Sequence, residues 1–201
     1  MTPSGRRSPT GSRERNDTRR VGQVGRVGQV GQPFRYYLRV RYIECDAQKV
    51  VFNSRYSEYV DVSINELLRA TGVLKDFTDG ELDFQLVKQT VEWKAPARFD
   101  EVLELSIAAT RLGNTSFTIG TEFRIAGNEQ VIVTAETVYV LVDARTLTKL
   151  PLPAAFRAAL QDGAAGCTTD HAACLRPGTG VDMSGPEREP RLAADRDARR
   201  A

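Results

Sequence analysis

Residues 55–71 read RYSEYVDVSINELLRAT, and this stretch predicts one long helix. Residues that suit a core recur in it at intervals of three and four, which is helical spacing. Charged and polar residues fall largely on the other faces, and Gly72 is a suitable residue to end the helix. The core-facing positions are Tyr56, Tyr59, Val60, Ser63, Ile64, Leu67 and Leu68.

Strand-like runs rich in β-branched and aromatic residues lie on both sides of this helix. The order of elements predicts an α+β fold with one long central helix wrapped by a five-stranded antiparallel sheet. One helix cannot cover both faces of such a sheet, so we expect the other face or an edge to meet a second subunit. A short last helix is expected near residues 156–160. The expected strands span residues 34–43, 84–94, 102–112, 116–126 and 130–142.

The sequence outside this pattern predicts two tails. Residues 1–33 are rich in arginine and include a repeat, VGQVGRVGQVGQ, with too much glycine for a stable helix or strand. From residue 162 the chain is poor in large apolar residues and rich in Gly, Pro, Asp and Arg. We therefore expect a disordered basic arm over 1–33, one folded domain over 34–161 and a disordered tail over 162–201.

Charge and composition restrict the partners. The net charge of the chain is +2, but residues 1–32 hold seven arginines and two acids, so the folded domain is weakly acidic. This balance argues against nucleic acid as a partner, and the arm has no aromatic residues for base stacking. No run approaches the roughly 18 apolar residues of a membrane span. Three cysteines form no disulfide framework, so we expect a cytoplasmic protein.

The composition and the absence of known motifs exclude most types of hydrolytic active site within the domain. The only histidine, His171, lies in the expected tail, which excludes a Ser-His-Asp triad or a Cys-His dyad within the domain. No G-x-S-x-G, P-loop or dinucleotide-binding motif occurs. Cys167, His171 and Cys174 supply three zinc-ligand types where a structural site normally takes four, so we expect no metal site.

Carboxylates remain as candidates. Asp46 lies in the loop between the first strand and the helix, seven residues before Asn53, close to where the helix begins. The first turn of a helix presents N–H groups without partners and partial positive charge, which would polarise a thioester carbonyl. A nearby carboxylate could attack that carbonyl or activate water. From the spacing alone, a loop acid that only accepts hydrogen bonds from backbone N–H groups is the simpler interpretation.

Residues 40–61, VRYIECDAQKVVFNSRYSEYVD, resemble the signature of the 4-hydroxybenzoyl-CoA thioesterase-like family of hotdog acyl-CoA thioesterases. The similarity continues through residues 91–105, 112–117 and 135–153, and it covers residues 34–161. The signature positions that this chain supplies in register are Arg41, Glu44, Asp46, Val51, Phe52, Asn53, Tyr56 and Asp61.

The resemblance implies a hotdog fold and hydrolysis of acyl-CoA to a free acid and CoA. It implies that Asp46 is the catalytic carboxylate, as nucleophile or as general base, and that the backbone N–H of Asn53 polarises the carbonyl. It also implies homodimers or homotetramers with active sites between subunits, and no cofactor, because CoA belongs to the substrate. The residues expected to bind substrate are Phe52, Tyr56, Arg111, Asn114, Thr115 and Ser116.

Two departures from the family keep an alternative open. Lys49 stands where the family usually has glycine, so we expect it to distort the loop or to bring a positive charge near Asp46. A basic trio of some members is replaced by residues 113–115, for which Arg111, Lys88 and Arg98 are candidate substitutes. The alternative is a non-catalytic hotdog protein that binds an acyl thioester as a sensor or carrier.

Overall fold

The computed structural model describes residues 32–80 and 82–174. The helix and the strands expected from the sequence are confirmed to within a few residues, whereas the short elements α2 and β6 were not predicted. In chain order the elements are β1 (Phe34–Arg39), the 3-10 turn η1 (Tyr42–Glu44), α1 (Arg55–Ala70), α2 (Leu74–Thr78), β2 (Leu82–Trp93), β3 (Val102–Leu112), β4 (Ser116–Ile125), β5 (Val131–Asp143), α3 (Ala154–Asp162) and β6 (Thr168–Asp170).

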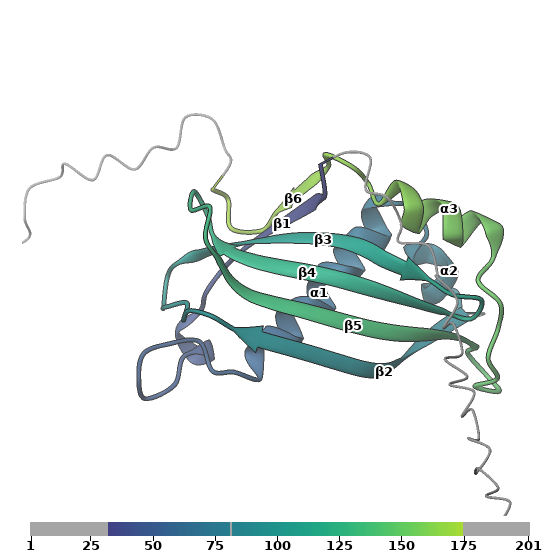
Figure 1. Cartoon of the computed structure of the whole chain (residues 1–201), viewed down its shortest axis with the longest axis horizontal. Coiled ribbons are helices and arrows are strands. Elements are labelled where there is room, and N and C mark those ends of the chain that lie inside the picture. The colour runs from purple at the N-terminus through teal and green to yellow at the C-terminus, as the bar shows by residue number, and fades with distance from the viewer. Residues whose placement is uncertain (1–31, 81, 175–201) are drawn as a thin grey trace, which may run out of the picture.

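The strands form one sheet in the order β2-β5-β4-β3-β1-β6 (Figure 1). Every pairing is antiparallel except that of β1 with β6, which is parallel. The expected antiparallel arrangement is therefore confirmed for five strands. The sixth strand is an addition at the β1 edge.

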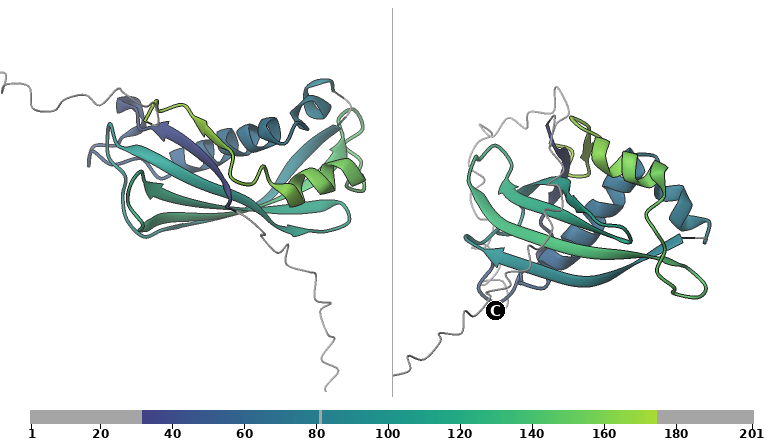
Figure 2. Two further views of the ribbon diagram at one scale, coloured as in Figure 1. Left: turned by 90° about the horizontal axis from the view of Figure 1, so that it is seen from above. Right: turned by 45° about the vertical axis from the view of Figure 1, so that its right-hand side comes forward.

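Helix α1 lies across the concave face of the curved sheet, as expected for a hotdog fold (Figure 2). Its predicted apolar stripe is buried against the sheet, and the side chains of Val60, Leu67 and Leu68 are fully buried. Removing side chains of this size from water contributes about 1.5–3 kcal/mol each, so this stripe holds the helix on the sheet. Gly72 follows the helix with a φ of +79°, a conformation that glycine adopts without strain.

The edge strand β2 is only partly covered. It pairs with β5 alone among the described strands, and its backbone leaves one edge open. Three large apolar side chains on it are about half exposed: Leu86, Val87 and Trp93. An open edge with exposed apolar side chains is a typical site of strand pairing between chains.

The expected disorder from residue 162 is wrong for residues 162–174. Gly163 ends α3 with a φ of +60°, and β6 then pairs with β1. The backbone N–H of His171 donates to the Tyr37 carbonyl (2.9 Å), and its Nδ1 lies 3.0 Å from the Tyr36 hydroxyl. The prediction from composition failed because the edge of β1 supplies backbone hydrogen bonds that order this segment. Residues 1–31 and 175–201, which hold most of both expected tails, lie outside the described residues.

Two further properties concern the described residues only. They contain no cluster of three or more His, Cys, Asp and Glu side chains arranged to hold a metal ion. None of their helices is long and apolar enough to cross a membrane.

Candidate active site

A short hairpin connects η1 to α1 and carries the predicted catalytic carboxylate. At its base the Phe52 N–H donates to the Glu44 carbonyl (2.9 Å), and further along the Asp46 N–H donates to the Val50 carbonyl (2.9 Å). The hairpin thus returns the chain to the start of α1 directly after Asp46. Residues 46 and 53 are brought to one end of the sheet by local structure alone.

The tip of the hairpin is a tight turn that contains Lys49, the residue that stands where the family usually has glycine. The Lys49 N–H donates to the Asp46 carbonyl (2.9 Å), and the φ angle of Lys49 is +63°. This left-handed conformation is the one that glycine adopts without strain and that other residues adopt at a cost. Lys49 therefore takes the backbone conformation that glycine would allow, and the tight turn after Asp46 is preserved.

The Asp46 carboxylate is anchored through one oxygen. Its Oδ1 accepts hydrogen bonds from the backbone N–H groups of Gln48 (2.8 Å) and Val50 (3.4 Å). No described residue donates to its other oxygen. Asp46 therefore fills the structural role of a loop acid, and it also keeps one oxygen without a donor among the described residues.

The backbone N–H groups at the N-terminus of α1 lie next to this loop, and one of them has no acceptor among the described residues. The Arg55 N–H donates to the Phe52 carbonyl and the Ser57 N–H to the Ser54 carbonyl. The Ser54 side chain makes no capping hydrogen bond. The Asn53 N–H has no acceptor among the described residues, so it is available to a ligand oxygen.

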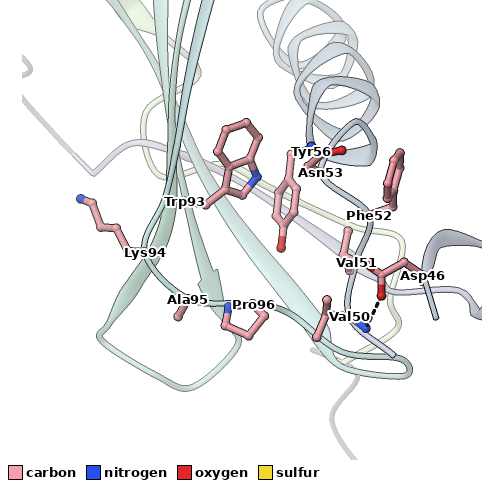
Figure 3. Close-up of a pocket in the computed structure, with 10 residues that line it drawn as sticks. All are labelled: Asp46, Val50, Val51, Phe52, Asn53, Tyr56, Trp93, Lys94, Ala95 and Pro96. Atoms are coloured by element: carbon pink, nitrogen blue, oxygen red, sulfur yellow. Dashed lines mark hydrogen bonds between the residues drawn. The ribbon is translucent and has the colours of Figure 1, made fainter. Parts of the chain in front are cut away.

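A pocket of about 440 Å³ brings these groups together. Of the residues predicted from the sequence, it includes Asp46, Phe52, Asn53 and Tyr56 (Figure 3). The remaining lining residues come from the same hairpin and from the end of β2 with the loop that follows. They are Val50, Val51, Trp93, Lys94, Ala95 and Pro96.

The walls of the pocket are aromatic. Tyr56 is buried, and its hydroxyl accepts a hydrogen bond from the Ala97 N–H (3.3 Å). Its ring meets Trp93 edge to face, with the ring centroids 6.5 Å apart. Trp93 and Lys94 extend to opposite sides of β2, so only Trp93 turns toward Tyr56 (Figure 3). Trp93 was not predicted from the sequence as a site residue, although it is the only tryptophan of the chain and stands in a predicted strand.

Arg111, Asn114, Thr115 and Ser116, which were expected to bind substrate, do not line this pocket. They occupy the end of β3, the turn that follows and the start of β4. Because Arg39 pairs with Val102, β3 starts beside the active-site loop and ends at the opposite end of the sheet (Figure 1). The β3–β4 turn therefore lies far from Asp46 within one chain.

Two aromatic residues that could have lined the pocket belong to the core instead. Tyr59 is 4% exposed, and Phe84 packs edge to face on Phe77 and Tyr139. Of the candidate cations, Arg98 follows the pocket loop and forms a β-bridge with Val50. Lys88 lies on the exposed edge strand β2.

Replacing Lys49 by glycine is expected to stabilise the protein. The substitution relieves the strain of the positive φ at Lys49, which by itself raises the free energy of unfolding by about 1 kcal/mol. The greater conformational freedom of glycine in the unfolded chain offsets part of this gain. Chemical denaturation of both proteins measures the difference. Gln48→Gly in the same turn is the control, since residue 48 has no positive φ and should lose stability. Equal destabilisation by the two substitutions would contradict a strained Lys49.

Comparison with known proteins agrees with this fold. The model of the thioesterase-like superfamily matches residues 40–160. The chain is 31% identical over 121 residues to the acyl-CoA thioester hydrolase YbgC of Escherichia coli O157:H7, covering 60% of this chain and 90% of that protein. It is 25% identical over 117 residues to the 1,4-dihydroxy-2-naphthoyl-CoA hydrolase of Synechococcus elongatus, covering 57% of this chain and 85% of that protein.

A solved structure shares the fold. It is Slr0204, a 1,4-dihydroxy-2-naphthoyl-CoA thioesterase from Synechocystis, with a TM-score of 0.59 and 21% identity. The match covers 64% of this chain and 96% of that one. The family match spans more than half of the chain and includes the hairpin, α1 and all of the sheet from β2 to β5. The chain therefore belongs to the thioesterase-like superfamily.

Proposed function

We propose that this protein is an enzyme that hydrolyses acyl-CoA thioesters to a free carboxylic acid and CoA. The observation that carries the proposal is one pocket lined by both Asp46 and Asn53. Among the described residues, the second carboxylate oxygen of Asp46 has no donor and the backbone N–H of Asn53 has no acceptor. Relatives named as acyl-CoA thioester hydrolases support it.

In the proposed reaction, the Asn53 N–H at the start of α1 donates to the thioester oxygen. Negative charge that develops on this oxygen is stabilised by the donor and by the positive end of the helix. Asp46 either attacks the carbonyl carbon to give an anhydride that water opens, or removes a proton from the attacking water. In both routes the C–S bond breaks, and the thiolate of CoA leaves and takes up a proton.

The proposed working unit is a homodimer joined through β2, or a homotetramer made of two such dimers. Trp93 at the end of β2 lines the pocket, whereas Leu82 at its start pairs with Asp143, close to the β3–β4 turn end of the sheet. Antiparallel pairing of two β2 strands would therefore bring residues 114–116 of the partner chain toward the pocket. The substrate residues that one chain keeps apart would meet in such a dimer.

We also propose a cytoplasmic location. Cys45, Cys167 and Cys174 are free thiols, and Cys167 and Cys174 are exposed. Unpaired exposed cysteines suit a reducing compartment.

The alternative of a non-catalytic acyl-thioester binder loses part of its support. It depended on a distorted loop at Lys49 and on the missing basic trio. Lys49 adopts a left-handed conformation, which glycine would allow, and the loop that presents Asp46 makes a tight turn. The missing trio concerns the affinity for CoA and does not remove a group that reacts.

Thiol release from acetyl-, hexanoyl-, palmitoyl- and benzoyl-CoA tests the proposed function. The purified protein is expected to release thiol from at least one of them, with a kcat in the range of about 1–1000 s⁻¹ that is typical of enzymes. Binding of the same thioesters is measured by calorimetry. Binding without thiol release would overturn the proposal in favour of a sensor or carrier.

A further inference from the structure

Glu44 is a buried carboxylate that has no role in the reaction proposed above. It lies two residues before Asp46, and only 2% of its surface is exposed. A buried charge without partners costs several kcal/mol, so a carboxylate retained at such a place must be compensated by specific contacts.

Arg41 supplies those contacts. Its backbone N–H donates to Oε2 of Glu44 (2.6 Å), and its Nε and Nη2 donate to Oε1 (2.8 and 2.5 Å). Burial by itself would raise the pKa of Glu44, but the hydrogen bonds from the Arg41 side chain and backbone hold that pKa below its ordinary value. Glu44 is therefore ionised and neutralised by Arg41. The guanidinium itself is largely exposed, with 72% of the Arg41 side chain accessible.

The same residue connects the hairpin to α1. The Glu44 carbonyl accepts the Phe52 N–H, next to Asn53. The buried hydroxyl of Tyr59, on the second turn of α1, faces the Glu44 carboxylate. Burial, and then Glu44, raise the pKa of Tyr59, so the phenol remains protonated. The Glu44 side chain is thus held by Arg41 in the segment before Asp46, and the Glu44 backbone carbonyl binds the segment that presents the Asn53 N–H.

From these contacts we propose that Glu44, clamped by Arg41, is a positioning residue that sets the Asp46 carboxylate relative to the Asn53 N–H. The inference rests on the proposed thioester hydrolysis. Asp46 and Asn53 must act on the same carbonyl, and a misplacement of about 1 Å can cost about a hundredfold in rate. Arg41 holds the Glu44 side chain in the segment before Asp46, and the Glu44 carboxylate lies near the Tyr59 hydroxyl on α1. Loss of the clamp is therefore expected to alter the position of this segment relative to α1 without removing either reacting group.

The test compares Glu44→Gln and Arg41→Met with wild type, using an acyl-CoA that the wild-type protein hydrolyses. Glu44→Gln puts an amide where one carboxylate oxygen accepts hydrogen bonds. Arg41→Met removes the guanidinium and is expected to lower stability, because it leaves the buried Glu44 carboxylate with the backbone N–H of residue 41. Each variant is expected to lower kcat by about tenfold or more, with KM changed less than about threefold. Rates are measured well below the unfolding midpoint, so that loss of folded protein does not contribute.

Arg69→Met is the matched control. Arg69 is exposed and pairs with the nearly buried Glu66 three residues earlier, as Arg41 pairs with Glu44, but it lies at the far end of α1. Loss of this pair is expected to lower stability slightly and to leave kcat within about twofold of wild type.

Combination with Asp46→Asn separates positioning from a general structural role. If Glu44 acts through Asp46, adding Glu44→Gln to Asp46→Asn lowers kcat by less than about twofold, because the two effects are not additive. Full additivity, or a wild-type kcat in both Glu44→Gln and Arg41→Met, would overturn the positioning role while the proposed function stands. Absence of thiol release from the wild-type protein overturns the proposed function first and this inference with it.

Discussion

Asp46→Asn is expected to lower kcat at least about a hundredfold with little change in KM, a loss of about 2.7 kcal/mol of transition-state stabilisation. Asn keeps an oxygen that can accept the N–H groups of Gln48 and Val50, so the hairpin keeps its shape. What it lacks is the charge and basicity of the free oxygen, which only the reaction requires. Steady-state thiol release by both proteins measures the effect.

The control for Asp46→Asn is the same substitution at Asp79, an exposed residue after α2 whose carboxylate makes a long ion pair with Lys75. It is expected to leave kcat unchanged. Thermal unfolding should show that Asp46→Asn stays folded at the assay temperature. A folded Asp46→Asn protein with more than about a tenth of the wild-type kcat would exclude Asp46 as the reacting carboxylate.

Leu86→Asp is expected to dissociate the proposed dimer and to abolish most activity with it. Leu86 is 53% exposed on the edge strand β2, and pairing of two β2 strands would place both copies at the interface. Two unpaired carboxylates in such an interface are expected to raise the dimer Kd at least about a hundredfold. The fraction of dimer, measured by sedimentation, and the rate of thiol release should fall together over the same range of protein concentration.

Leu147→Asp is the control for this variant, since Leu147 is equally exposed but lies after β5 and not on the edge strand. The assembly and activity of the control are expected to match those of wild type. A Leu86→Asp monomer with full activity would overturn the site formed by two chains. A wild-type monomer at micromolar concentration would overturn pairing through β2.

The predicted helix was confirmed because its signal is local. Periodic apolar positions from Tyr56 to Leu68 determine one buried face whatever surrounds them. The strands were predicted for the same reason, from β-branched runs separated by turn residues. The order of the strands in the sheet is not a local property, and β6 was missed because a short polar segment carries no periodic signal. It is ordered by the open edge of β1.

The candidate site also contains residues that were predictable from local sequence and others that were not. Asp46, Phe52, Asn53 and Tyr56 lie within eleven residues of one another, and one hairpin followed by one helical turn brings them together. Trp93 comes from a strand that is distant in sequence, so its place beside Tyr56 could not be read from spacing. The resemblance to a family supplied Arg111, Asn114, Thr115 and Ser116 as substrate residues, but it did not indicate that they lie at the opposite end of the sheet from Asp46.

The sequence by itself determined the long helix, the runs that become strands and the placement of Asp46 directly before a helix N-terminus, because each depends on contacts between residues close in the chain. Only the tertiary structure decided that Trp93 lines the pocket, that β2 has an open edge among the described strands and that the β3–β4 turn lies at the opposite end of the sheet. These features depend on strand order and register, which follow from the packing of distant segments around one core.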